Sequence, residues 1–184
     1  MKTIKVLLLE DMSDDFTKIE KIIGEISKEL VTHQVQLELL YDYNDSRILI
    51  SNFVASETME IYLQQPLKDV VLEKVQHIQK ENNLICLLDI VWADDARRKM
   101  VKGEKVYEYG CTFYCTHLNE HRINQNTIIV SALTKKPDKM KSIPLVTKFN
   151  KEVPFGEEFK NKLKSAICAL PIVNIKLPKT KIDV

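Results

Sequence analysis

The chain has 184 residues, which fits one domain with a substantial hydrophobic core. Its 27 basic and 26 acidic residues leave a net charge of +1, which argues against a nucleic-acid-binding or anionic-membrane-binding protein. The apolar runs are far shorter than the roughly 20 residues that span a bilayer, so we expect no membrane segment.

The N-terminal sequence MKTIKVLLLED reaches acidic residues early and lacks the small-residue cleavage site of a signal peptide. Four cysteines in a chain of this length do not suggest a disulfide framework, and we therefore expect a cytoplasmic protein. The four glycines form no GxGxxG, Walker or GxSxG motif, which argues against nucleotide sites and hydrolase sites of those types.

The first predicted element is a buried strand over residues 4–9, IKVLLL, which ends at Glu10 and Asp11. A helix follows, because the apolar residues of 16–30 fall on one helical face, and Ser13 is the candidate N-cap.

Alternating apolar and polar residues over 35–39 predict a second strand at an edge of the sheet. The long segment 42–83 is interpreted as helical, with Pro66 as the first residue of a second helix in it. The uninterrupted apolar run 84–88 then predicts a strand buried on both faces, and it ends in a carboxylate, Asp89.

A further helical stripe covers residues 107–118 and precedes a short buried strand, 128–130, which ends at Ser131. The sequence SIPLVTKF predicts another strand, and its Pro144 confines that strand to an edge. A last helix is predicted over 159–170.

Strands that alternate with helices indicate an α/β protein with right-handed crossovers. With the second and fifth strands at the edges, we predict a doubly wound five-stranded parallel sheet of order 2-1-3-4-5, the flavodoxin-like arrangement. It would carry an enlarged helical segment between strands two and three and a short helix between strands four and five. Residues 1–170 would form the domain and 171–184 a C-terminal tail.

Functional side chains follow four of the five predicted strands, and all would face one crevice because parallel strands end at the same edge. They are Glu10, Asp11, Asp89, Ser131 and Lys148. Three crowded carboxylates repel one another, and a hard divalent cation, in the first place Mg²⁺, relieves that repulsion. A lysine and a hydroxyl opposite them suit a bound phosphoryl group.

The motifs LLLED, CLLDIVW, IIVSA and LVTKF resemble, in this order, those of the receiver domain of bacterial two-component response regulators. The resemblance covers about residues 1–170 and implies that Asp89 is the phosphoacceptor, with Ser131 and Lys148 binding the phosphoryl oxygens. The implied Mg²⁺ ligands are Glu10, Asp11, Asp89 and the backbone carbonyl of Val91. The implied donor is a histidine kinase or a phosphotransfer protein.

The chain departs from the family pattern at several places. Phe149 follows Lys148 where the family has a cis-proline, and Leu145 stands at the family's aromatic switch position. The segments 42–83 and 89–103 are longer than usual. Because too little chain follows the last strand for a DNA-binding domain, we expect output through a separate effector protein or a homodimer.

Two other functions compete with the receiver hypothesis. A pseudo-receiver would use the same fold as an unphosphorylated binding scaffold. A metal-dependent phosphoesterase would resemble the topoisomerase–primase domain, but Val91 replaces the second aspartate of its Asp-x-Asp motif and Ser131 and Lys148 have no role in it.

The sequence CTFYCTHLNEH contains the ligand types of a zinc site. On one helix, however, Cys111 and Cys115 point away from His117 and His121, so we predict buried cysteines and surface histidines instead.

Three further features have a plain and a functional interpretation. The lysines of 135–141 form a solvated loop or a docking site for an acidic partner. Arg97 and Arg98 pair with neighbouring aspartates or close over a phosphoryl group. Trp92 is interpreted as a packing residue rather than a ligand platform.

Overall fold

A computed structural model of the chain describes residues 1–92, 109–118, 126–132, 136–148 and 155–173. Its strands are β1 (Lys2–Leu9), β2 (Val35–Leu39), β3 (Leu84–Leu88), β4 (Thr127–Ser131) and β5 (Leu145–Thr147). Its longer helices are α1 (Ser13–Leu30), α2 (Tyr43–Thr58), α3 (Ile61–Gln79) and α5 (Phe155–Ala169). The shorter helical pieces are η1 (Val31–His33), α4 (Tyr109–Phe113), the π-helical η3 (Tyr114–Leu118) and η6 (Asp138–Met140).

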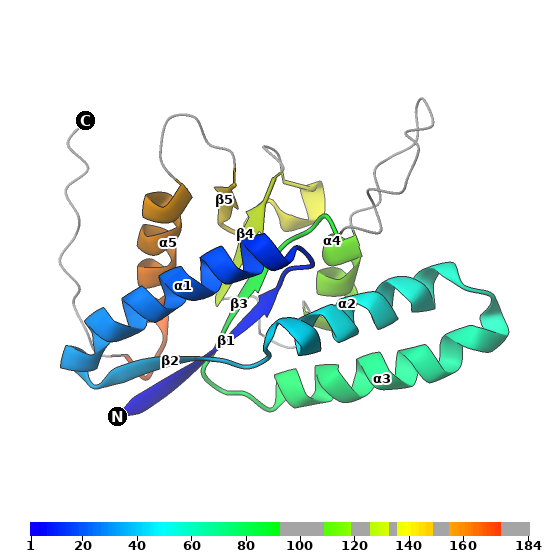
Figure 1. The fold of residues 1–184 in the computed structure, drawn as a ribbon, viewed down its shortest axis with the longest axis horizontal. Coiled ribbons are helices and arrows are strands. Elements are labelled where there is room, and N and C mark those ends of the chain that lie inside the picture. The colour runs from blue at the N-terminus through cyan, green and yellow to red at the C-terminus, as the bar shows by residue number, and fades with distance from the viewer. Residues whose placement is uncertain (93–108, 119–125, 133–135, 149–154, 174–184) are drawn as a thin grey trace.

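The five strands form one sheet in the order β2-β1-β3-β4-β5, and every neighbouring pair is parallel. Helices cover both faces (Figure 1), so the predicted doubly wound, flavodoxin-like α/β fold is confirmed. The two edge strands are β2 and β5, as their patterns indicate. The register pairs Leu9 with Leu88 and Ser131 with Thr147, which brings the carboxyl ends of these strands together at one edge.

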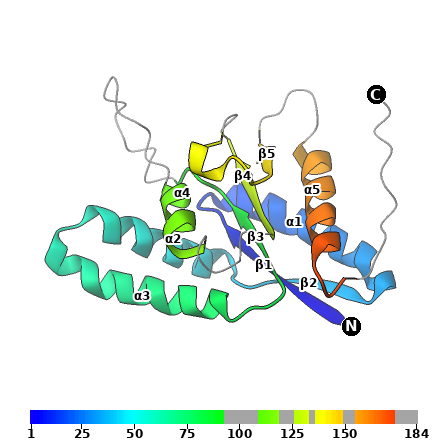
Figure 2. The same cartoon turned by 180° about the vertical axis from the view of Figure 1, so that it is seen from behind.

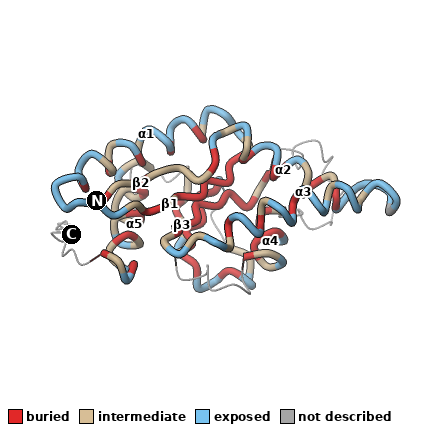
Figure 3. Tube along the Cα trace, turned by 90° about the horizontal axis from the view of Figure 1, so that it is seen from below, coloured by how far each residue is buried: buried red, intermediate tan, exposed pale blue. Residues whose placement is uncertain are grey.

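The central strand β3 is buried along its whole length, as its uninterrupted apolar run predicts. Its side chains alternate between two cores, with Leu84, Cys86 and Leu88 on one face and Ile85 and Leu87 on the other. The central strands are correspondingly the most buried part of the trace (Figure 3).

Helices α1 and α5 cover one face of the sheet (Figure 2). The apolar stripe of α1 is buried there from Phe16 to Leu30, and α5 contributes Phe159, Leu163 and Ile167. Ion pairs join the two helices at Lys160–Glu25 (2.6 Å) and Lys164–Glu29 (2.5 Å). The N-cap of α1 is Met12 and not Ser13, and no side chain caps this helix end.

The opposite face carries α4 and an antiparallel hairpin of α2 and α3, which accounts for the enlarged segment between β2 and β3 (Figure 1). The Asp42 side chain caps α2 by accepting a hydrogen bond from the Asp45 amide (2.9 Å). Helix α3 begins at Ile61, so the prediction that Pro66 opens a helix is wrong. Proline is tolerated so near the helix start because its missing amide costs one hydrogen bond to the Tyr62 carbonyl, and Tyr62 is exposed.

Between β4 and β5 the described helical structure is the single turn η6, in agreement with the predicted short helix. Beyond α5, Leu170 and Val173 still pack into the core on the α1 side, and the remainder of the predicted tail lies outside the described residues. Within the described part of the chain, no helix has both the length and the apolar character needed to cross a bilayer.

Candidate functional site

The structure brings all five predicted site side chains together at the carboxyl edge of the sheet. Glu10 and Asp11 follow β1, Asp89 follows β3, Ser131 ends β4 and Lys148 follows β5. The Asp89 amide donates to the Leu9 carbonyl (2.9 Å), and the Lys148 amide donates to the Ser131 carbonyl (2.9 Å). Backbone hydrogen bonds of the sheet thus continue into the site and hold its side chains in register.

Asp89 lies at the centre of the group and is buried. Its Oδ1 accepts hydrogen bonds from the Ser131 hydroxyl (2.8 Å) and from the Val91 amide (3.0 Å). Its Oδ2 accepts from the Lys148 ammonium (2.7 Å). Each oxygen therefore accepts from a side chain at the end of another strand, in addition to the local contact of Oδ1 with the Val91 amide.

Lys148 contacts three carboxylates at once. Its Nζ lies 2.7 Å from Glu10 Oε2, 2.7 Å from Asp89 Oδ2 and 3.0 Å from Asp15 Oδ2. The side chains of Lys148, Glu10 and Asp89 are only 9%, 1% and 5% exposed, whereas Asp15 reaches solvent. The ammonium therefore has an acceptor for each of its N–H bonds and is held in a site that is almost closed.

The electrostatics of the site centre on Glu10. Its pKa is raised to about 8, first by burial and then by the charge of Asp89, although Lys148 and the Met12 amide act in the opposite direction. For Lys148, burial opposes the charged form, but Asp89 and Glu10 outweigh burial and raise its pKa. When both are ionised, the two buried carboxylates carry more negative charge than the one Lys148 ammonium can neutralise.

This donor set fits a hard divalent cation. Glu10, Asp11 and Asp89 each offer a carboxylate oxygen, and these three oxygens lie within 4.8 Å of one another. An all-oxygen set with surplus negative charge suits a hard divalent cation better than a softer metal. The backbone of Asp11 is held from outside by the Tyr43 hydroxyl, which donates to its carbonyl (3.0 Å).

Two residues of the site were missed by the sequence analysis. Asp15 was overlooked because acidic residues in a first helical turn usually serve the helix dipole, although EDMSDD places four carboxylates within six residues. Gly110 was assigned only to a helical stripe. A Cβ on Gly110 would lie 2.2 Å from the Asp89 carbonyl oxygen and 2.7 Å from Ile90 Cα, so the backbone of α4 packs directly on the turn that carries Asp89.

The other candidates serve packing or lie outside the described residues. Trp92 is buried, with its ring edge-on to Phe53 (5.9 Å between centroids), as predicted. Cys111 is buried, but His117 is half-buried against Phe113 (5.2 Å between centroids) rather than on the surface, because η3 continues the buried face of α4. Lys135, Arg97, Arg98, His121 and Phe149 lie outside the described ranges.

Comparisons with known proteins return nothing: no family model, no curated protein and no solved structure matches this chain.

The close approach of Gly110 to Asp89 predicts the effect of a single methyl group. We expect Gly110→Ala to lower the free energy of unfolding by about 1–3 kcal/mol, because the added Cβ must push the Asp89 turn aside. Gly24→Ala is the matched control: nothing lies within 4 Å of its Cβ position in α1, and alanine should stabilise the helix by roughly 0.5–1 kcal/mol. Denaturant unfolding measures both, and equal effects of the two substitutions would contradict the close contact.

The raised pKa of Glu10 predicts a pH-dependent stability in the presence of a chelator. Since the folded chain favours protonated Glu10, this contribution is complete below the ordinary pKa of 4.5 and disappears as the pH rises through about 8. Glu10→Gln cannot ionise, so its stability relative to the parent should rise between pH 5 and pH 9, by on the order of a few kcal/mol. Unfolding curves of both proteins at several pH values test this, and a constant difference would exclude a buried titrating Glu10.

Proposed function

We propose that the chain is a receiver of a two-component phosphorelay, in which Asp89 accepts a phosphoryl group in an Mg²⁺-dependent reaction. The observation that supports it most is the surrounding of Asp89, whose oxygens meet a hydroxyl from β4 and an ammonium from β5 beside two further carboxylates. The donor would be a histidine kinase or a phosphotransfer protein in the cytoplasm.

In the proposed reaction a carboxylate oxygen of Asp89 attacks the phosphorus atom of a phosphohistidine. The new O–P bond replaces the P–N bond, whose electron pair leaves with the imidazole, and the product is an acyl phosphate. The Ser131 hydroxyl and the Lys148 ammonium, which both contact Asp89, would bind the phosphoryl oxygens. Mg²⁺ on Glu10, Asp11, Asp89 and the Val91 carbonyl would neutralise the negative charge that accumulates there.

The two alternatives use the same residues less fully. A phosphoesterase would have no task for Ser131 or Lys148, although both contact Asp89 directly. A pseudo-receiver could retain the cluster as a structural ion pair, and this alternative is separated from the proposal by phosphorylation itself.

For the output, the α2–α3 hairpin is the proposed contact surface with an effector protein or a second copy. Of residues 62–70, all described, none is buried, although they form the first turns of a long helix. Apolar side chains lie exposed there, at Tyr62, Leu63 and Val70, with Met59 just before them. Tyr62, Pro66 and Val70 are spaced by four residues and so share one side of α3. A helix start with no fully buried residue gains stability from a partner.

Phosphorylation of Asp89 is tested with acetyl phosphate. We expect mass spectrometry to show one added phosphoryl group in the presence of Mg²⁺ and none in the presence of EDTA. Asp89→Asn should abolish the labelling because the amide is no nucleophile, whereas Asp14→Asn, an exposed neighbour of the site, should leave it unchanged. A parent protein that neither accepts the phosphoryl group nor binds beryllofluoride with Mg²⁺ would support the pseudo-receiver instead.

The output surface is tested by replacing apolar side chains that the fold does not need. We expect Tyr62→Ser with Leu63→Ser to abolish capture of the partner, or dimerisation seen by sedimentation velocity, without lowering thermal stability, because both residues are exposed. Lys139→Ser, on η6 between β4 and β5, is the control and should have no effect. The reverse pattern would place the partner on the β4–β5 side and refute the hairpin surface.

A further inference from the structure

The site contains a cation of its own, the Lys148 ammonium. It lies 2.7 Å from Glu10 Oε2 and 2.7 Å from Asp89 Oδ2, and these two carboxylates belong to the group that could hold a divalent ion. Metal and ammonium therefore draw on the same two carboxylates, and like charges so close together repel strongly in a buried place. A divalent ion on these carboxylates would therefore compete with Lys148 for its contacts.

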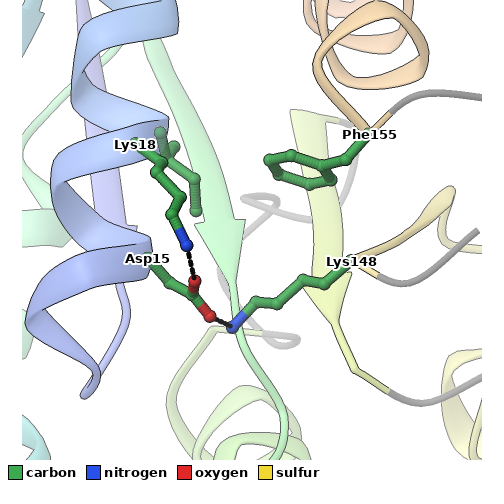
Figure 4. A pocket seen from close by; sticks show the side chains of 5 residues that line it. Asp15, Lys18, Lys148 and Phe155 are labelled. Carbon is green, nitrogen blue, oxygen red and sulfur yellow. Dashed lines mark hydrogen bonds and ion pairs between the residues drawn. The ribbon is translucent and has the colours of Figure 1, made fainter.

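A second place for the ammonium lies next to the site. Asp15 Oδ2, in the first turn of α1, is 3.0 Å from Lys148 Nζ but does not belong to the acidic group that could hold the metal. The neighbouring hollow of about 90 Å³ is lined by Asp15, Lys148, Lys18, Ile19 and Phe155. Figure 4 shows the Lys148 side chain reaching across this hollow to the Asp15 carboxylate, which also meets Lys18 (3.3 Å).

We propose that Lys148 acts as an internal exchangeable cation: when Mg²⁺ binds, the ammonium leaves Glu10 and Asp89 and is retained by Asp15. Asp15 is thus a positioning residue that acts through Lys148, and it touches neither the metal nor the phosphoryl group. The proposal rests on the metal site of the proposed function. It explains why a third carboxylate accompanies a lysine that already contacts two buried ones.

Magnesium binding to four proteins, measured by titration calorimetry at constant ionic strength, tests the exchange. They are the parent chain, Asp15→Asn, Lys148→Met and the double variant. We expect Lys148→Met to bind Mg²⁺ about tenfold more tightly, because the competing ammonium is gone. Asp15→Asn should weaken binding by about fivefold in the parent, because the displaced ammonium has lost its acceptor, but by less than about twofold in Lys148→Met.

The double-mutant cycle separates this mechanism from simple attraction of the metal by one more carboxylate. Simple attraction would make Asp15→Asn equally harmful with and without Lys148, and that result, like weaker binding in Lys148→Met, would overturn the exchange. The exposed control Asp14→Asn gives the size of the general charge effect. Failure of all four proteins to bind Mg²⁺ would instead overturn the metal site of the proposed function, and the exchange with it.

A measurement on the unaltered chain covers the case in which Lys148→Met does not fold. The side-chain ¹⁵N–¹H signal of Lys148, assigned through its loss in Lys148→Arg, should be visible without metal because three carboxylates protect the ammonium. We expect this signal to shift on saturation with Mg²⁺ and to broaden in Asp15→Asn under the same conditions. A signal that stays in place at saturation in the parent would refute the displacement.

Discussion

The contact of one buried ammonium with carboxylates from three different elements is the interaction on which this site depends. Lys148 at the end of β5 binds Glu10 after β1, Asp89 after β3 and Asp15 in α1, so it joins segments that are far apart in the sequence. Without it, the buried carboxylates of Glu10 and Asp89 would face one another with no positive charge between them, which is costly in a protein interior. Parallel strands in register make the contact possible because they deliver these side chains to one edge.

The same contact leaves part of the negative charge of the buried carboxylates uncompensated. A single ammonium does not remove the cost of burying Glu10, whose pKa remains raised. A site of this kind holds donors and charges in place before any ligand arrives, so that a divalent cation relieves repulsion that already exists rather than having to create a pocket. The Ser131 hydroxyl, fixed on Asp89 Oδ1, belongs to the same prepared arrangement.

The fold was predictable because its signals are local and repeated. An apolar run such as Leu84–Leu88 buries both faces of a strand whatever its neighbours are, and the functional ends of the strands then follow from parallel topology. Pro66 was misplaced because a proline is compatible with several positions near a helix start, and sequence alone does not rank them.

Asp15 and Gly110 were missed for a different reason. Their roles exist only in three dimensions, as the reach of Lys148 to α1 and the contact of α4 with the Asp89 turn. Neither contact leaves a periodic pattern in the sequence. The acidic cluster EDMSDD was visible, but its assignment to the site requires the position of β5, which supplies the lysine.

The packing around Trp92 connects the proposed acceptor to the proposed output surface. Trp92 lies three residues after Asp89 and packs against Phe53 of α2 (5.9 Å between centroids) and Phe113 of α4 (5.8 Å). The rings of Phe53 and Phe113 are also in contact (5.1 Å between centroids). A movement of the Asp89 turn would therefore press on a close-packed aromatic group to which α2 contributes Phe53. On the β5 side, the aliphatic Leu145 packs against the same core. The aromatic contacts next to the proposed acceptor therefore lead to α2 and α4, and a signal that uses them would reach the hairpin through α2 rather than leave by β5.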